Sequence, residues 1–297
     1  LEFVPRGWFV PVTPGTRLVT VGGAVASDVH GKNHHVAGAF SDHVESLDIL
    51  LGSGEILTIG PTQHPDLFRA TCGGMGLTGV ILTVTLRLIR IESSRIIETT
   101  IKAANLDAAV EVFHENSDST YSVAWIDCLA RGSSLGRSLI MLGEHAAGGD
   151  LSIKRGGALP IPIDVPSVVM NPLTVKAFNT LYFHKALTSR RTREVPLEPY
   201  FYPLDALADW NRLYGSRGFV QYQFVLPMLG GLEGLRIVLE RIAQSGAGSF
   251  LAVLKVFGRG NANFLSFPME GYTLALDFKA EARTLTLLED LDSIVRE

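Results

Sequence analysis

Glycine is distributed unevenly along this chain, and that distribution limits the folds open to it. Of 30 glycines, 13 lie within the first 93 residues, in clusters between short runs rich in β-branched side chains. These runs cover residues 18–21, 56–59 and 80–91, and the last alternates in part between apolar and polar positions. Alternation with a period of two is typical of a strand. We therefore expect the first 93 residues to form short strands joined by glycine turns.

After Ser93 the pattern changes to longer elements. Apolar stripes predict amphipathic helices over 106–114 and 232–242, and β-branched or aromatic runs predict strands over 121–126, 219–226, 250–257 and 272–278. Residues 146–200 are rich in proline and glycine with weak periodicity, which predicts a long functional or mobile loop. The sequence thus predicts two α+β domains, residues 1–93 and 94–297.

The bulk composition argues against several classes of protein. A net charge of -4 over 297 residues leaves no basic stripe for a nucleic-acid backbone. Two cysteines, Cys72 and Cys128, are too few for a disulfide framework or a cysteine zinc site. The sequence has no signal-peptide pattern and no apolar run of about 18 residues, the length a bilayer-spanning helix needs. We expect no nucleic-acid partner and no transmembrane segment.

Both ends have the character of internal positions in a longer chain. The sequence opens without methionine at Leu1, and it closes at Glu297 within a helix-like pattern that carries Leu287 and Leu291 on one face. We therefore expect a fragment.

Two glycine-rich loops are candidates for ligand binding. Residues 74–79 match G-x-G-x-x-G, but a strand pattern follows them, whereas a dinucleotide-binding loop opens a helix. A tight glycine turn is the better interpretation. In the other loop, Gly15 and Gly22-Gly23 form two small-residue turns separated by the run 18–21. Backbone N–H groups in such turns can face a pyrophosphate. An ordinary β-rich domain with glycine turns explains the pattern equally well.

Four histidines, His30, His34, His35 and His43, invite a metal hypothesis. A helical i,i+4 pair from His30 and His34 would have to run through Gly31 and Asn33, which are poor helix formers. The zincin glutamate is absent between them. We therefore predict no metal site, and we expect hydrogen-bonded loop histidines.

Several motifs together resemble a known family. Residues 14–24, which read PGTRLVTVGGA, resemble the FAD-binding module of the vanillyl-alcohol-oxidase-like flavoproteins. The segments HGKNHH at 30–35 and TCGGMGLTG at 71–79 narrow the resemblance to the decaprenylphosphoryl-β-D-ribose oxidase family, and it continues through 210–215, 221–224 and 265–268. The resemblance implies an α+β, two-domain FAD-linked oxidase fold. It places the central part of an FAD-binding domain at 1–93 and a substrate domain with a mainly antiparallel sheet at 94–297. It also implies that an FAD-binding segment of about a hundred residues precedes Leu1, and that a closing stretch with an active-site lysine follows Glu297.

The resemblance also implies the site residues. The positions implied to contact FAD are Gly15, Thr16, Thr20, Val21, Gly22, Gly23, Ser27, Asp28, Val29, His30 and Ile81. Those implied to line the substrate pocket are Lys32, Phe201, Gln221, Gln223, Leu251, Lys255 and Phe257. His30 and Lys255 are the implied catalytic groups, because alcohol oxidation needs a hydride acceptor, the flavin N5, and a group that takes the hydroxyl proton. Flavin positioning by His30 and a phosphate contact by Lys255 are the alternatives.

The implied reaction oxidises the 2′-hydroxyl of a polyprenyl-phosphate ribose to a ketone. A separate NAD(P)H-dependent reductase would complete epimerisation to the arabinose donor, in the cell envelope, either periplasmic or at the cytoplasmic membrane. The chain departs from mycobacterial members of the family, which carry serine, tyrosine, asparagine and cysteine at the positions of Val123, Phe201, Thr273 and Ala275. These departures keep open a related sugar, aldonolactone or alcohol oxidase, and also a non-enzymatic scaffold.

Overall fold

A computed structural model describes residues 1–153, 157–166 and 171–297, and it contains two separate sheets of three or more strands within those ranges. The larger sheet has seven strands, all antiparallel to their neighbours, in the order β10-β6-β8-β7-β13-β14-β12. The strands are β6 (Arg95–Ala103), β7 (Tyr121–Ile126), β8 (Ser138–His145), β10 (Arg190–Pro196), β12 (Phe219–Pro227), β13 (Ala252–Phe257) and β14 (Gly271–Lys279).

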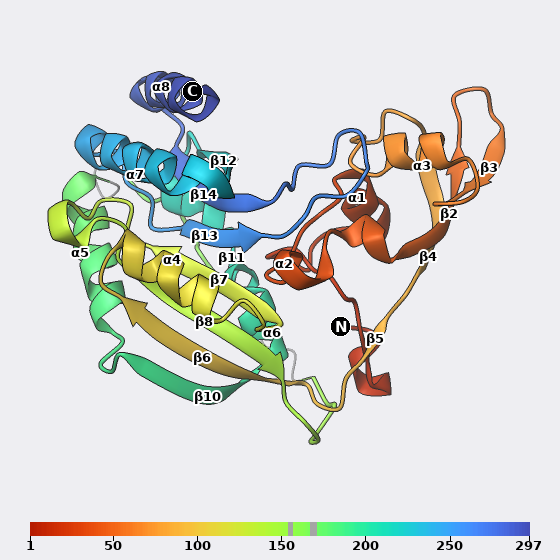
Figure 1. Cartoon of the computed structure of the whole chain (residues 1–297), viewed down its shortest axis with the longest axis horizontal. Coiled ribbons are helices and arrows are strands. Elements are labelled where there is room, and N and C mark those ends of the chain that lie inside the picture. The colour runs from red at the N-terminus through yellow and green to blue at the C-terminus, as the bar shows by residue number, and fades with distance from the viewer. Residues whose placement is uncertain (154–156, 167–170) are drawn as a thin grey trace.

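Helices cover one face of this sheet (Figure 1). Side chains of α4 (Leu106–Glu115), α7 (Met228–Ser245) and α8 (Ala282–Arg296) bury a core against it, with Leu235, Leu254 and Leu274 at 0% exposure. Since side chains alternate across a strand, Lys255 and Ala275 lie on the opposite face. That face carries the candidate site.

The smaller sheet, in the order β3-β2-β4, belongs to the first part of the chain. It contains β2 (Val44–Leu50), β3 (Ile56–Ile59) and β4 (Val80–Leu86), and it packs with α1 (Val21–Ala26) and α3 (Pro65–Thr71) around Val25, Ile49 and Phe68. The chain also contains several short elements: α2 (His34–Ala37), α6 (Leu197–Phe201), β1 (Trp8–Phe9), β5 (Ile89–Arg90), β9 (Leu159–Pro160) and β11 (Leu207–Ala208). The predicted boundary near Ser93 falls between the two larger sheets.

The α+β fold class is confirmed, as are both helices and all four strands predicted after Ser93, to within a few residues at their ends. Also confirmed is the order of elements around the G-x-G-x-x-G match, since α3 precedes residues 74–79 and strand β4 follows them. A dinucleotide-binding loop requires the reverse order.

The strand predicted over 18–21 is wrong. Val21 begins helix α1, and Thr20 is its N-cap, because the Thr20 hydroxyl accepts a hydrogen bond from the Gly23 N–H at 3.0 Å. Leu18 is 80% exposed, so no neighbouring strand pairs with or covers this run. The Gly22-Gly23 pair therefore lies in the first turn of a helix instead of a loop between strands.

The prediction of one long loop over 146–200 is also wrong over 172–184, which form a helix, and over 190–196, which form a strand. Residues 154–156 and 167–170 lie outside the described part, but α5 (Pro172–His184) and β10 occupy much of the remainder. The weak periodicity of α5 has a simple cause. Only Val175, Asn179 and Phe183 are buried along it, whereas Leu173 and Leu181 are more than 70% exposed. With so few buried positions, the apolar face of this helix is too narrow to be recognised as a helical period in the sequence.

Candidate active site

His30 lies where the first part of the chain meets the large sheet. After α1 ends, Asp28 adopts a left-handed conformation (φ 40°) that reverses the chain, and His30 then forms an isolated antiparallel bridge with Ala39. The imidazole faces the end of β13, with its ring centroid 4.7 Å from that of Phe257.

Both nitrogens of His30 have partners on the sheet. The Lys255 Nζ lies 3.1 Å from Nδ1, and the Gln223 amide nitrogen lies 3.3 Å from Nε2. Burial lowers the pKa of His30 well below its usual value, and the nearby Lys255 charge lowers it further. Burial also lowers the pKa of Lys255, to about 8. His30 is therefore neutral, and Lys255 can lose its proton within the physiological range.

The hydrogen bonds around Gln223 favour the neutral form of the lysine. Gln223 donates one amide N–H to Thr273 Oγ1 at 3.1 Å, while the Thr273 hydroxyl donates to the Phe224 carbonyl. The second amide N–H then faces His30 Nε2, which must accept. The imidazole proton is thereby placed on Nδ1, and only an uncharged amine at Lys255 can accept it. A charged Lys255 would donate to Nδ1 instead, which moves the imidazole proton to Nε2 and costs the hydrogen bond from the Gln223 amide. The pair can thus take up or release one proton at Nζ.

A second buried amine lies near this pair. Lys32 donates to the Tyr200 carbonyl, and its Nζ is 4.2 Å from the centroid of the Tyr200 ring. Burial lowers the pKa of Lys32 to about 7, the Glu98 carboxylate opposes that shift, and the Lys255 charge adds to it. Two amines of reduced basicity in one region suit an anionic or electron-rich ligand group.

The remaining residues implied for the substrate pocket fall into two groups. Gln221 and Leu251 lie along the same face of the sheet as Gln223, but the Gln221 amide donates to the Asp277 carboxylate at 2.9 Å instead of reaching His30. Phe201 is 3% exposed and packs within an aromatic cluster, with its ring 4.8 Å from that of Tyr121. The centroid of the Phe201 ring lies 5.9 Å from Lys32 Nζ, so Phe201 packs beside this amine.

The residues implied to contact FAD form one largely exposed strip. Gly15, Thr20, Val21, Gly23 and Ser27 are exposed, and Gly22 lies against Ile81, where an added Cβ would make an ordinary contact at 3.6 Å. An added Cβ at Gly15 would meet nothing within 4 Å. Neither position has the positive φ that favours glycine, so the protein itself does not require glycine there.

Two polar side chains of this strip make hydrogen bonds to other parts of the protein. The Thr16 hydroxyl donates to Asp205 at 2.7 Å, and Asp205 also accepts from the Arg17 N–H at 2.8 Å. The Asp28 carboxylate is 0% exposed and receives its hydrogen bonds from protein groups. The sequence alone did not predict these roles. The partner of Thr16, Asp205, is more than 180 residues away, and one partner of Asp28, Ser266, is more than 230 residues away.

Comparisons with known proteins agree with this geometry. The FAD binding domain family matches residues 2–60. Decaprenylphosphoryl-β-D-ribose oxidase of Mycolicibacterium smegmatis is 38% identical over 99% of this chain and 66% of the relative. An uncharacterised Streptomyces coelicolor protein, encoded in the mprA 5′ region, is 34% identical over 98% of this chain and 83% of the relative. D-arabinono-1,4-lactone oxidase of Yarrowia lipolytica is 37% identical over only 24% of this chain.

The chain belongs to the vanillyl-alcohol-oxidase family of FAD-binding flavoproteins. It spans about two thirds of the length of the mycobacterial relative. FAD is thus the cofactor, and the structure is compatible with it. Glycines that the fold does not need, Gly15 and Gly22, lie on an exposed strip that leads to His30, which is what close backbone approach by a pyrophosphate requires.

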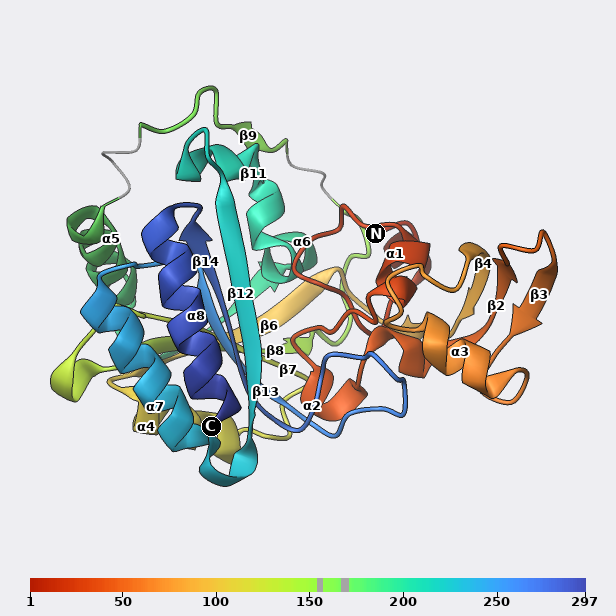
Figure 2. The same cartoon turned by 90° about the horizontal axis from the view of Figure 1, so that it is seen from above.

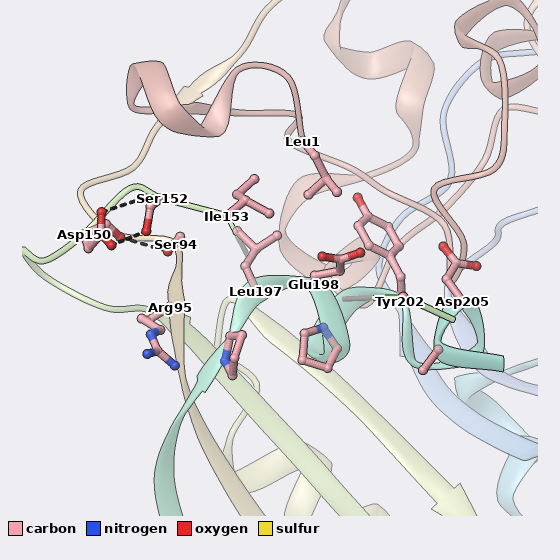
Figure 3. Close-up of a pocket in the computed structure, with 14 residues that line it drawn as sticks. Leu1, Ser94, Arg95, Asp150, Ser152, Ile153, Leu197, Glu198, Tyr202 and Asp205 are labelled. Carbon is pink, nitrogen blue, oxygen red and sulfur yellow. Dashed lines mark hydrogen bonds between the residues drawn. The ribbon is translucent and has the colours of Figure 1, made fainter. Parts of the chain in front are cut away.

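A cavity of about 410 Å³ lies elsewhere, between α6 and the start of β6 (Figure 3). None of its lining residues belongs to the His30–Lys255 cluster. Its lining carries three carboxylates, Asp150, Glu198 and Asp205, and one guanidinium, Arg95. Even with Arg17, which pairs with Glu198 and Asp205, negative charge prevails, so the cavity is unsuited to a phosphate. The chemistry therefore points to His30 and Lys255 and not to this cavity.

The other histidines make backbone or ring contacts. The Nε2 atoms of His35 and His43 bond the carbonyls of Ser119 and Ala37, and the His34 ring packs on Phe257. Within residues 1–153, 157–166 and 171–297, no group of three or more His, Cys, Asp or Glu side chains is arranged to hold a metal ion. Across the same ranges, no helix combines the length and apolar character needed to cross a bilayer.

Proposed function

We propose that the protein is an FAD-dependent oxidoreductase that oxidises the 2′-hydroxyl of decaprenylphosphoryl-β-D-ribose to the 2′-keto form. The observation that carries this proposal is the contact between Lys255 Nζ and His30 Nδ1 at the end of the FAD-binding strip. The similarity to the mycobacterial oxidase over 99% of the chain supports the choice of substrate.

Oxidation of a secondary alcohol removes a hydride from carbon and a proton from oxygen. A bound flavin supplies the hydride acceptor. The proton needs a base on the protein, and neutral Lys255, whose pKa is lowered to about 8, can take it once its lone pair turns from the His30 Nδ1–H to the hydroxyl. His30 holds the amine in place through Nδ1, and Gln223 fixes the imidazole through Nε2. Lys32 lies nearby with its pKa lowered to about 7, and a phosphate bound beside it would favour the charged form of this amine.

The proposed product is a ketone, so epimerisation to the arabinose form would require a separate NAD(P)H-dependent reductase. A lipid-linked substrate further suggests work in the cell envelope, either in the periplasm or at the cytoplasmic membrane. Both statements depend on the proposed substrate.

A related aldonolactone or alcohol oxidase is the second candidate function. Thr273 and Ala275 on the pocket face of β14 offer less polar contact than the asparagine and cysteine of mycobacterial members. In addition, a segment that makes up 24% of the chain is similar to D-arabinono-1,4-lactone oxidase. Less polar walls would relax selection among sugar hydroxyls.

Anaerobic bleaching of the flavin absorbance distinguishes the candidates. With the flavin-loaded protein, decaprenylphosphoryl ribose should bleach the flavin at micromolar concentrations, whereas D-arabinono-1,4-lactone should not. Bleaching by the lactone alone would establish the second candidate, and bleaching by neither would contradict both.

A further inference from the structure

The connection between β13 and β14 is far longer than its ends require. These strands are antiparallel neighbours, and hairpin loops between such strands usually contain 2–5 residues. Here residues 258–270 intervene and leave the sheet to reach α1 and α3 in the first part of the chain (Figure 1, Figure 2). Ordering a long irregular loop costs conformational entropy, so specific contacts at its far end are needed to hold it in one conformation.

Those contacts converge on one carboxylate, that of Asp28. Its Oδ2 accepts from Asn261 Nδ2 at 2.8 Å, Asn263 Nδ2 at 3.0 Å and Ser266 Oγ at 2.6 Å. Its Oδ1 accepts from the Ser41 N–H at 2.9 Å. The same two asparagine amides also donate to the Ser41 hydroxyl.

These four donors nearly exhaust the acceptor capacity of the carboxylate, which has about four lone-pair directions. Asp28 is also 0% exposed. Its side chain is therefore occupied by the loop, and any cofactor contact at this position falls to the backbone. A carboxylate also bonds more strongly than a neutral acceptor, which explains an acidic residue here.

The fastened loop passes beside the candidate active site. His30 follows Asp28 by two residues, and the Phe267 ring lies 6.0 Å from the His30 ring. At its other end the loop begins against α2, where a Cβ added to Gly258 would come within 2.8 Å of the His35 carbonyl oxygen. The position of Phe267 thus depends on contacts made by its immediate neighbour, Ser266.

We propose that Asp28 is a positioning residue whose carboxylate fastens the 258–270 loop to the FAD-binding strip and holds Phe267 beside His30. Asp28 binds neither substrate nor flavin through its side chain. Its effect on turnover rests on the proposed function, whereas its effect on the loop does not.

Limited trypsin digestion of the flavin-loaded protein tests the fastening directly. Arg259 is exposed within the loop, so cleavage after it reports how often the loop opens. In Asp28→Asn, whichever way the new amide turns, its N–H faces groups that donate in the unmodified protein, either the Ser41 N–H or the amides of Asn261 and Asn263. Cleavage after Arg259 should be at least about tenfold faster, the factor expected for loss of one charge-assisted hydrogen bond. The double variant Asn261→Ala/Asn263→Ala changes only the loop, so it covers the case in which Asp28→Asn does not fold.

The matched control is Asp48→Asn in the smaller sheet. The Asp48 carboxylate accepts from the hydroxyls of Thr58 and Thr83 and does not contact the loop. Its cleavage rate after Arg259 should equal that of the unmodified protein. Flavin content, read from absorbance, should stay unchanged in all three variants.

With a substrate that reduces the flavin, the two loop variants should raise KM about tenfold, while the reduction rate at saturation changes by less than about twofold, since His30 and Lys255 remain in place. Flavin loss in Asp28→Asn with normal loop protection would show that Asp28 is a cofactor ligand. Unchanged cleavage in both loop variants would also overturn the proposal. If the unmodified protein oxidises no alcohol, the proposed function fails, and the digestion result still decides the role of Asp28.

Discussion

The two linings of the candidate active site are built on opposite principles. The strip of positions implied to contact FAD, from Gly15 to Ser27, is largely exposed and rich in glycine, and an added Cβ at Gly15 or Gly22 would meet little of the protein itself. The sheet wall across β12, β13 and β14 carries side chains already joined to one another, such as Gln223 to Thr273. The first lining can recognise a ligand through its backbone, and the second through the chemistry of its side chains. Substitutions on the two sides should therefore fail in different ways.

Lys255→Ala should have the largest effect on catalysis and none on cofactor binding. It removes the proposed proton acceptor, so flavin reduction by substrate should slow by about 10²–10⁴-fold. Stopped-flow absorbance under anaerobic conditions measures this rate. Lys102→Ala is the matched control, because the Lys102 amine also lies over an aromatic ring, but on β6, where it donates to the Ala186 carbonyl. Equal rates in the two variants would remove Lys255 from the mechanism.

The pH dependence of flavin reduction should follow the same amine. A lowered pKa of about 8 means that Lys255 is charged below that pH and neutral above it. If the neutral amine takes the proton, the rate should rise about tenfold per pH unit below 8 and level off above it. His30 stays neutral across this range because its pKa is lowered well below the usual value. A bell-shaped or flat profile would point to a different base.

Gly22→Ala tests the other lining. The new Cβ would contact Ile81 at an ordinary distance, so the melting temperature of the flavin-free protein should hardly change. FAD affinity should fall about tenfold, because a methyl group in a close-packed contact costs at least 1–3 kcal/mol. Gly52→Ala is the control, since a Cβ there would meet nothing within 4 Å and the position lies outside the strip. Fluorescence titration with FAD measures both, and equal affinities would show that the strip does not hold the cofactor.

The same contrast explains what could be predicted from sequence. On the sheet wall, alternation alone places Val253, Lys255 and Phe257 on one face, and the structure agrees. The meeting of Lys255 with His30 joins residues 225 apart, which no local pattern encodes. Only the family resemblance indicated it.

In the glycine-rich strip, the local sequence led to a wrong prediction of a strand over 18–21. Residues 18–21 have β-branched character but find no neighbouring strand, so the capping hydroxyl of Thr20 decides in favour of a helix. The order Thr-Val-Gly-Gly-Ala could have signalled a helix N-terminus, although glycine weakens that signal. The role of Asp28 depends on Asn261, Asn263 and Ser266, more than 230 residues further along the chain, and could not be predicted locally.

The smallest effect on activity is expected from Ala275→Cys, and it tests the orientation of the sheet wall. Ala275 pairs with Gln223 on one side and Val253 on the other, so its methyl group faces the candidate site. A thiol there adds little volume or polarity, and turnover should stay within about twofold. A maleimide should then modify the introduced thiol and abolish turnover.

The unmodified protein provides a low background, because Cys72 and Cys128 are buried and burial raises the pKa of each to about 12. Leu274→Cys, one residue earlier on the helix-covered face and 0% exposed, is the control and should resist labelling. Mass spectrometry identifies the adduct. Labelling of the control at the rate of Ala275→Cys would show that the wall does not present this face to the site, and the pairing of Lys255 with His30 would then need another explanation.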